Sequence, residues 1–220
     1  IFVGADEGSG EYDTFNLFRK NSSTPVWSYE LPEGEWTTDN LAISADGDYL
    51  VGTANFIADG SDGGKIYFFD KDSSTPLWSY TTSTYTTAVS ISADGNYVAA
   101  GIKSSASYEF SFFSKGSGTP LWGYSVDSDV TAVSVSANGR YVVVSSDDDK
   151  INVFDKDGNS RWSFEADYDI SSVEFSSDGE YISVGSQGKG YLFAVGSSSP
   201  IWTFSNYVQD VDISSDGKYV

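Results

Sequence analysis

The sequence predicts an all-β protein, a β-propeller of four-stranded antiparallel blades, and three observations support this. Two short phrases alternate along the chain, five times each. The strand-like segments between them alternate apolar and polar residues, which is the period of a strand. No stretch has helical periodicity. The first phrase, of the form Ser-x-Asp/Asn-Gly-x-Tyr, begins at residues 44, 92, 136, 176 and 214.

The second phrase contains a tryptophan and ends each unit. Its tryptophans are Trp27, Trp78, Trp122, Trp162 and Trp202, spaced 51, 44, 40 and 40 residues apart. Four short strands every 40 to 50 residues are typical of a propeller blade. We therefore expect one domain over residues 1–220, with repeat units at about 1–43, 44–91, 92–135, 136–175 and 176–213, and with 214–220 starting the next unit or closing the ring.

One unit shows how each strand is recognised. In "AVSIS" (88–92) alternate residues fall on opposite faces, which predicts the first strand. "ADG" then forms a tight turn into the second strand, "NYVAAG" (96–101). The third and fourth strands are exemplified by "KIYFFD" (65–70) and "LWSYT" (77–81), with Pro76 at the entry to the last strand, where a missing N–H costs little.

The ends of the chain leave two readings open. "VQDVDIS" (208–214) could pair with residues 1–4 and close a five-bladed ring. Alternatively, the chain is part of a larger propeller, because it starts and stops inside what reads as the same strand. The second reading is the one we favour.

The composition excludes several classes of function. The chain has no cysteine and no histidine, so thiolate chemistry, zinc–thiolate sites and histidine acid–base catalysis are absent. A net charge of −20 disfavours nucleic acids and anionic membranes. No apolar run is long enough to span a bilayer, so no membrane insertion is expected within this chain. The acidic surface indicates a soluble extracellular or high-salt protein.

The repeats resemble two known families. "AVSISADGNYVAAG" resembles the WD-repeat pattern, and "FDKDSSTPLWSY" is similar to the repeat of pyrroloquinoline-quinone-type propellers, also called quinoproteins. The resemblance covers essentially the whole chain and implies a tryptophan docked between blades. The chain departs from true WD repeats because it lacks the Gly-His pair, and Phe69-Asp70 stands where Trp-Asp would be.

The five repeated tryptophans are assigned to blade packing, because so large an aromatic side chain suits the interface between two sheets. A ligand-stacking role is the alternative. A second aromatic and acidic set falls just before the first strand of each unit. We predict that it forms a collar around the pore mouth that binds protein or glycan; packing of the turns is the alternative. This collar consists of Trp36, Tyr85, Asp129, Tyr168 and Tyr207.

Two further sites are suggested by short motifs. Asp155, Asp157 and Asn159 stand at alternate positions, like the start of a calcium loop, although Ser160 replaces the required glycine. Asn21 begins an Asn-x-Ser glycosylation pattern. No other cofactor is expected.

The sequence thus indicates a non-catalytic interaction module, extracellular or at the cell surface of an archaeon or bacterium, that binds protein or glycan through its loop-rich face. A self-assembling subunit of a surface layer or filament is the alternative. A quinoprotein-like dehydrogenase is disfavoured, because its dedicated cofactor residues cannot be placed in this chain.

Overall fold

Nineteen short strands make up the regular structure of the computed structural model, which describes residues 1–5, 12–103, 108–126 and 128–220. No helix occurs among these residues, and so none of them forms a helix that could cross a membrane. The strands are β1 (Phe2–Ala5), β2 (Thr14–Phe18), β3 (Pro25–Glu30), β4 (Glu35–Ile43), β5 (Tyr49–Ala58), β6 (Ser61–Asp70), β7 (Trp78–Thr82), β8 (Thr86–Ile91), β9 (Tyr97–Ile102), β10 (Tyr108–Ser114), β11 (Trp122–Val126), β12 (Val130–Val135), β13 (Tyr141–Ser146), β14 (Lys150–Asp155), β15 (Ser160–Glu165), β16 (Ile170–Phe175), β17 (Tyr181–Ser186), β18 (Gly190–Ala194) and β19 (Pro200–Phe204).

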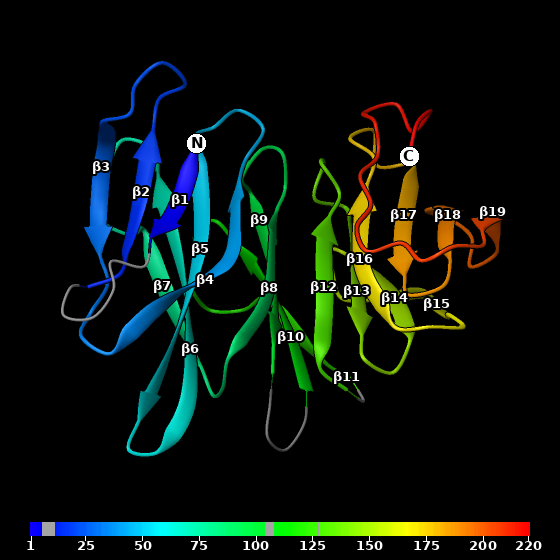
Figure 1. Ribbon diagram of the computed structural model, residues 1–220, viewed down its shortest axis with the longest axis horizontal. Helices are drawn as coiled ribbons and strands as arrows, with labels where there is room; N and C mark the ends of the chain where they lie inside the picture. Colours follow the sequence, from blue (N-terminus) through cyan, green and yellow to red (C-terminus); the bar gives the residue numbers. More distant parts are fainter. Residues whose placement is uncertain (6–11, 104–107, 127) are drawn as a thin grey trace.

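The strands form five antiparallel sheets, each built from consecutive strands. We call them the first blade (β1–β3), second (β4–β7), third (β8–β11), fourth (β12–β15) and fifth (β16–β19). The blades stand side by side, from β1–β3 at one end of the row to β16–β19 at the other (Figure 1). The first strands of neighbouring four-stranded blades lie next to one another, so they form the inner wall. The prediction of an all-β propeller is confirmed.

The recurring Ser-x-Asp-Gly phrase is a turn that satisfies its own polar groups. At residues 44–49 the Ser44 hydroxyl donates to the Asp46 carboxylate (2.5 Å) and accepts from the Tyr49 backbone N–H (3.0 Å). Asp46 also accepts from the Asp48 N–H. The same bonds recur in the turns that begin at residues 92 and 176. A short hydroxyl and a short carboxylate are needed for this local network, which explains why the phrase repeats.

These turns also hold one blade to the next. The Ala45 N–H donates to the Ala93 carbonyl (3.0 Å), and the Ala93 N–H donates to the Ala137 carbonyl (3.1 Å). Gly95 has a positive φ of 67°, and a Cβ atom added there would overlap the ring of Tyr49 in the preceding blade. Glycine is therefore required both by the backbone conformation and by the close approach of a neighbouring ring.

The outer-strand tryptophans lie between blades. Trp78 stacks on Phe68 of its own blade (5.0 Å between ring centroids, 6° between planes) and on Phe113 of the next blade (5.4 Å, 23°). Its indole N–H donates to the Lys115 carbonyl of that next blade (3.0 Å). Three other tryptophans make the equivalent bond to the following blade, at 2.7 to 2.9 Å: Trp27 to Lys71, Trp122 to Lys156 and Trp162 to Val195.

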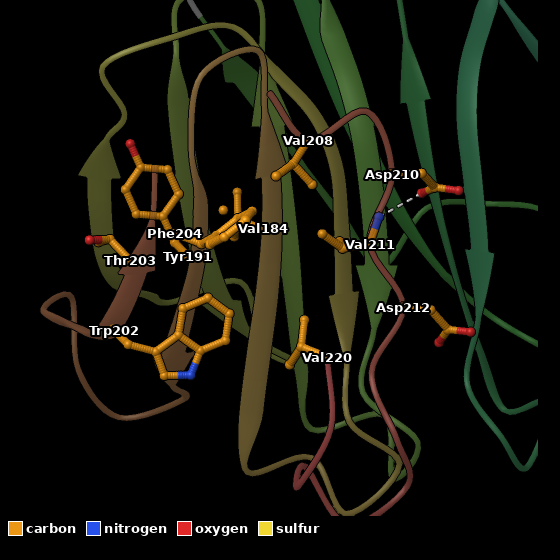
Figure 2. Close-up of a pocket in the computed structure, with 11 residues that line it drawn as sticks. Val184, Tyr191, Trp202, Thr203, Phe204, Val208, Asp210, Val211, Asp212 and Val220 are labelled. Carbon is orange, nitrogen blue, oxygen red and sulfur yellow. Dashed lines mark hydrogen bonds between the residues drawn. The ribbon is translucent and has the colours of Figure 1, made fainter. Parts of the chain in front are cut away.

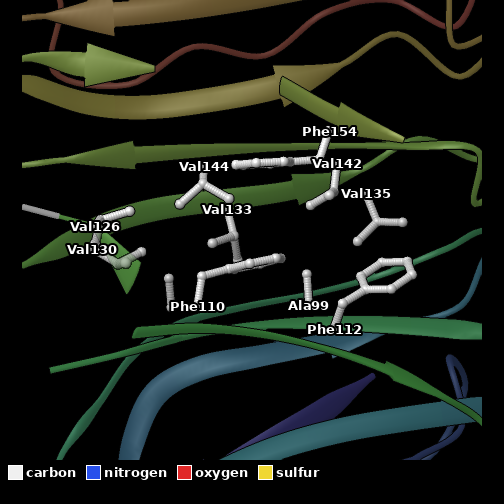
Figure 3. Close-up of a cluster of buried hydrophobic side chains, with 11 residues drawn as sticks. Ala99, Phe110, Phe112, Val126, Val130, Val133, Val135, Val142, Val144 and Phe154 are labelled. Atoms are coloured by element: carbon white, nitrogen blue, oxygen red, sulfur yellow. The ribbon is translucent and has the colours of Figure 1, made fainter. Parts of the chain in front are cut away.

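Apolar side chains fill each space between blades. Between the third and fourth blades, Phe110 and Phe112 from β10 face Val142, Val144 and Phe154, as Figure 3 shows. Corresponding clusters fill the other three interfaces between neighbouring blades. Because every internal blade packs against a neighbour on both faces, its middle strands are buried along most of their length, as are residues 142–146 of β13.

The first blade differs from the others, because it has three strands and no inner strand. In the described part of the chain, β1 pairs with β2 alone, so residues 208–214 are not paired with residues 1–4. The two ends of the chain lie apart in Figure 1. The ring closure that we considered from the sequence is therefore not seen in this structure.

The close approach at Gly95 leads to a first prediction. Gly47 has a similar φ of 75° but open space around its Cβ position, so Gly47→Ala measures the conformational cost alone. We expect that cost to be about 1–2 kcal/mol. Gly95→Ala should lose a further 1–3 kcal/mol or so from the clash with Tyr49. Chemical denaturation of both variants measures the difference, and equal losses would contradict the interlocked arrangement.

The tryptophan bond leads to a second prediction. Trp78→Phe removes the donor to Lys115 and part of the packed ring, so the free energy of unfolding should fall by about 2 kcal/mol. Trp202→Phe is the matched control, because Trp202 holds the same place in the fifth blade but is 39% exposed. That substitution should cost less than about 0.5 kcal/mol. Equal losses in denaturant titrations would show that the bond between blades does not matter.

Candidate functional site

One end of the molecule, the lower end in Figure 1, carries the connections from one blade to the next and the turns between second and third strands. We call it the loop-rich end. Of the longer loops that the sequence places here, residues 6–11 and 104–107 lie outside the described residues. The described segments of this end are residues 31–36, 58–61, 82–86, 128–130, 146–150, 166–170, 186–190 and 204–208.

Two collar residues, Trp36 and Tyr85, meet at this end. Their rings are 6.0 Å apart and nearly perpendicular, at 65°. The Tyr85 hydroxyl donates to the Asp62 carboxylate (2.7 Å), which fixes the ring and raises the pKa of Tyr85. Trp36 remains 38% exposed. The structure thus forms an exposed aromatic pair with a carboxylate beside it, which is able to bind a cation or an apolar group.

A long hairpin supports this pair. β5 and β6 have ten residues each, against five to seven in the equivalent strands of the later blades. The extra length pairs Trp36 with Asn55, so Trp36 lies within β4 and not in a loop. At the base of the hairpin the Glu35 carboxylate accepts from Tyr67 and bonds Lys65 (3.1 Å). Burial, followed by the hydrogen bond to Glu35, raises the pKa of Tyr67.

The third collar member, Asp129, lies in an acidic stretch of the same end. It forms an ion pair with Lys103 (3.1 Å), which reaches over from the third blade. Its backbone carbonyl accepts from the Asp147 N–H. Burial, then the charges of Asp129 and Asp169, raises the pKa of Asp147. Negative charge is therefore concentrated here, and a cationic partner would relieve the repulsion.

Tyr168 and Tyr207 occupy different surroundings. The Tyr168 ring lies against Gly188 of its own blade, where an added Cβ would overlap it. Tyr207 is 63% exposed. Of the five collar residues, Trp36 and Tyr85 form the ring contact seen in the described part of the chain. Tyr168 therefore also packs against the turn that contains Gly188.

A pair of contacts between blades at this end was not predicted from the sequence. The Asp13 carboxylate accepts from the backbone N–H (2.7 Å) and hydroxyl (3.0 Å) of Thr37 in the next blade. Asn55 makes the same two bonds to Thr86, at 3.0 and 3.1 Å. The recurring threonine at the start of the inner strand was the available signal. These bonds fix the position of the aromatic pair, because Trp36 and Tyr85 each precede one of the two threonines.

The turn with Asp155, Asp157 and Asn159 is a hydrogen-bonded link between β14 and β15. The Asp155 carboxylate accepts from the backbone N–H groups of Asp157 and Asn159 and from the Asn159 side chain. Arg140, Lys156 and Arg161 line the same surface hollow. Among the described residues, no three acidic side chains are grouped as a metal site requires. Calcium binding at this turn stays a prediction, as does glycosylation of Asn21, which is exposed in the turn between β2 and β3.

The polar residue at one position of the inner wall differs between blades: it is Ser90 in the third, Ser134 in the fourth and Glu174 in the fifth. Ser90 and Ser134 each accept a backbone N–H from the next inner strand, Val135 at 3.1 Å and Phe175 at 3.3 Å. Glu174 holds the equivalent place on β16, as its pairing with Ser183 shows. Burial, then the charges of Asp212 and Asp210, raises the pKa of Glu174 to about 7.

The raised pKa leads to a third prediction. An NMR titration should show Glu174 protonating near pH 7 and not at its ordinary 4.5, and Asp212→Asn should lower the midpoint. The folded protein then holds a proton that the unfolded chain loses, so stability falls as pH rises from about 4.5 to 7. The loss should follow the measured midpoint, at about 1.4 kcal/mol for each pH unit by which that midpoint lies above 4.5. A midpoint near 4.5 would contradict the clustering of these carboxylates.

Comparison with known proteins identifies the repeat. A search of curated proteins found no match. Residues 62–206, which are 145 of the 220 residues, match the family model described as outer membrane protein assembly factor BamB. This agrees with the resemblance to pyrroloquinoline-quinone-type repeats and with the tryptophan contacts between blades. The chain belongs to the BamB-like family of pyrroloquinoline-quinone-type β-propeller repeat proteins.

Proposed function

We propose that this protein is a non-catalytic interaction module that binds another protein through its loop-rich end. The observation that carries the proposal is the exposed Trp36–Tyr85 pair, held by Asp62 in a fixed orientation. Aromatic rings of this kind contribute much of the binding energy at protein interfaces, because they bury a large area at a small cost in entropy. The matching family is described as an assembly factor, which is in keeping with a role in binding proteins.

The negative charge at this end favours a partner with cationic side chains. Aspartates outnumber lysines in its described loops, and the whole chain carries a net charge of −20. A segment that presents lysine or arginine beside an apolar side chain would suit both the carboxylates and the rings. The acidic residues of this surface include Asp59, Asp62, Asp129, Asp147, Asp148, Asp149, Asp167 and Asp169.

Location and chemistry complete the proposal. We place the protein outside the cell or at the cell surface. Its acidic surface keeps it soluble there, and a domain without cysteine does not depend on a reducing compartment. We assign no catalytic step, because the chain contains neither histidine nor cysteine and the Asp62 carboxylate beside the aromatic pair is engaged by the Tyr85 hydroxyl.

A binding experiment tests the site. Lysine-rich 12-residue peptides, with and without one tryptophan, are titrated into the protein while the intrinsic fluorescence is followed. Trp36→Ala combined with Tyr85→Ala should weaken binding at least tenfold, because both rings are lost. Tyr85→Phe should weaken it about two- to threefold, because only the bond to Asp62 is lost. Raising the salt concentration should weaken all of these affinities.

The control is Leu121→Ala, since Leu121 is an exposed apolar residue at the opposite end of the third blade. This variant should bind the peptides as the unchanged protein does. A glycan array run in parallel addresses the alternative ligand. Binding that survives the loss of both rings, or binding to neutral glycans and to none of the peptides, would overturn the proposal.

A further inference from the structure

The fourth blade carries a basic hollow at the end of the molecule opposite the loop-rich end. It lies beside the turn from β12 to β13 and the turn from β14 to β15, and its volume is about 290 Å³. Arg140, Lys156 and Arg161 contribute positive charges to its lining, and Asp155 and Asp157 contribute negative ones. The hollow thus has a positive balance in a chain whose net charge is −20.

The charges of the two arginines are not neutralised within the described residues. Neither guanidinium group forms an ion pair or donates a side-chain hydrogen bond there. The nearby carboxylates are already engaged, because Asp155 accepts from groups of its own turn and Asp157 pairs with Lys156 (2.6 Å). Arg140 and Arg161 are therefore available to an anion, and the planar fork of a guanidinium group matches the two oxygens of a carboxylate.

Both arginines are departures from the repeat. The residue before each outer-strand tryptophan is apolar and exposed in the other blades, whereas Arg161 takes this place in the fourth. Arg140 follows the turn glycine, where an acidic residue or an asparagine stands in the second, third and fifth blades. The packing of the repeat does not require arginine at either place, since the other blades fold without it. The residues equivalent to Arg161 are Val26, Leu77, Leu121 and Ile201, and those equivalent to Arg140 are Asp48, Asn96 and Glu180.

Tyr141 adds an aromatic ring to the hollow. Tyr49 and Tyr97, its equivalents in the second and third blades, each lie over the turn glycine of the following blade, with the ring 2.3 Å from an added Cβ atom. At Gly179, the corresponding glycine beyond Tyr141, the nearest atoms are 3.6 Å away and none belongs to the ring. Tyr141 instead lines the hollow, with the Arg140 guanidinium 5.9 Å from its ring centroid.

The hollow beside β19 has the opposite chemistry (Figure 2). Its volume is about 580 Å³, and its lining is mainly apolar, with Asp210 and Asp212 as its charged groups. No basic side chain among the described residues lines it. An anion would be repelled there. The cations of the fourth blade are therefore particular to one hollow and are not a general property of this surface.

The lining of the basic hollow restricts the kind of anion. A doubly charged phosphate is disfavoured, because Asp155 and Asp157 line the same hollow and the whole chain is acidic. A single carboxylate is repelled less and suits the guanidinium groups equally well. The volume of about 290 Å³ is close to that of the smallest ligand pockets, so the hollow has room for a ring beside the carboxylate.

We propose that the basic hollow binds a sugar acid, which carries a carboxylate on a hydroxylated ring. The carboxylate binds Arg140 and Arg161, and the face of the sugar ring lies against Tyr141. The Asp157 carboxylate accepts a hydrogen bond from a ring hydroxyl, because its pairing with Lys156 leaves lone pairs unused. This site is separate from the loop-rich end and does not depend on the protein partner proposed there.

NMR of the arginine side chains tests the proposal. The chain contains three arginines, so the spectrum has three Nε–H signals, and Arg19 is an internal control in the corresponding turn of the first blade. Sodium glucuronate should shift the signals of Arg140 and Arg161 with a Kd of about 1 mM and leave that of Arg19 in place. At constant ionic strength, acetate and inorganic phosphate should bind at least about fivefold more weakly, because acetate has no ring and phosphate has a second charge. Glucose should cause no shift.

Substitutions identify the signals and the site. Arg140→Gln and Arg161→Gln should each weaken glucuronate binding about tenfold, because one of the two charged donors is lost. Arg19→Gln is the matched control and should bind as the unchanged chain does. Thermal unfolding should give the same midpoint for all three variants, since arginine is not needed at these places in the other blades.

Four results would overturn the proposal. One is the absence of arginine shifts with glucuronate, and another is an affinity for acetate or phosphate equal to that for glucuronate. A third is unchanged glucuronate binding by the chain that carries both Arg140→Gln and Arg161→Gln. Calcium chloride is a further probe, because calcium at this turn would need the carboxylates that lie beside the arginines. The fourth result is a shift of the two arginine signals by calcium and not by glucuronate.

Discussion

The contact between an outer-strand tryptophan and the following blade is the interaction on which the rest of this structure depends. A single four-stranded sheet buries little apolar surface, so no blade is stable without its neighbours. In each internal interface the indole ring fills the space between two sheets, and its N–H donates to a carbonyl just beyond the third strand of the next blade. The bond fixes how far one blade is shifted relative to the next, and apolar packing alone does not fix that shift.

This arrangement separates the parts of the molecule by role. The blade faces and the Ser-x-Asp-Gly turns are occupied in holding the row together, as the bonds from Ala45 to Ala93 and onward show. Variation is left to the loop-rich end, where the long β5–β6 hairpin carries Trp36 into a strand and brings it against Tyr85. A rigid stack with variable loops is the usual way in which such scaffolds present a binding surface.

Much of the fold could be predicted from the sequence, because each regular feature repeats. Asp-Gly pairs mark the turns, and the tryptophan spacing marks the blades. The stacking of Trp78 between Phe68 and Phe113 follows from the same periodicity. Individual departures from the repeat are harder to predict, since each depends on a contact between residues far apart in the chain. The extended pairing of Trp36 with Asn55 depends on the length of one hairpin, and the bond from the Thr37 N–H to the Asp13 carboxylate joins two blades. The collar was predicted as five equivalent positions, but the structure gives them different surroundings, because the loops of the blades differ in length.

Hydrogen exchange of the six indole N–H groups, followed by NMR, tests the central claim most directly. If the tryptophans hold the blades together, the indole protons of Trp27, Trp78, Trp122 and Trp162 exchange slowly, because their bonds break only when blades separate. Those of Trp36 and Trp202, which are open to solvent, exchange at rates close to those of a free indole. Six similar rates, or fast exchange at the four interface positions, would contradict the account.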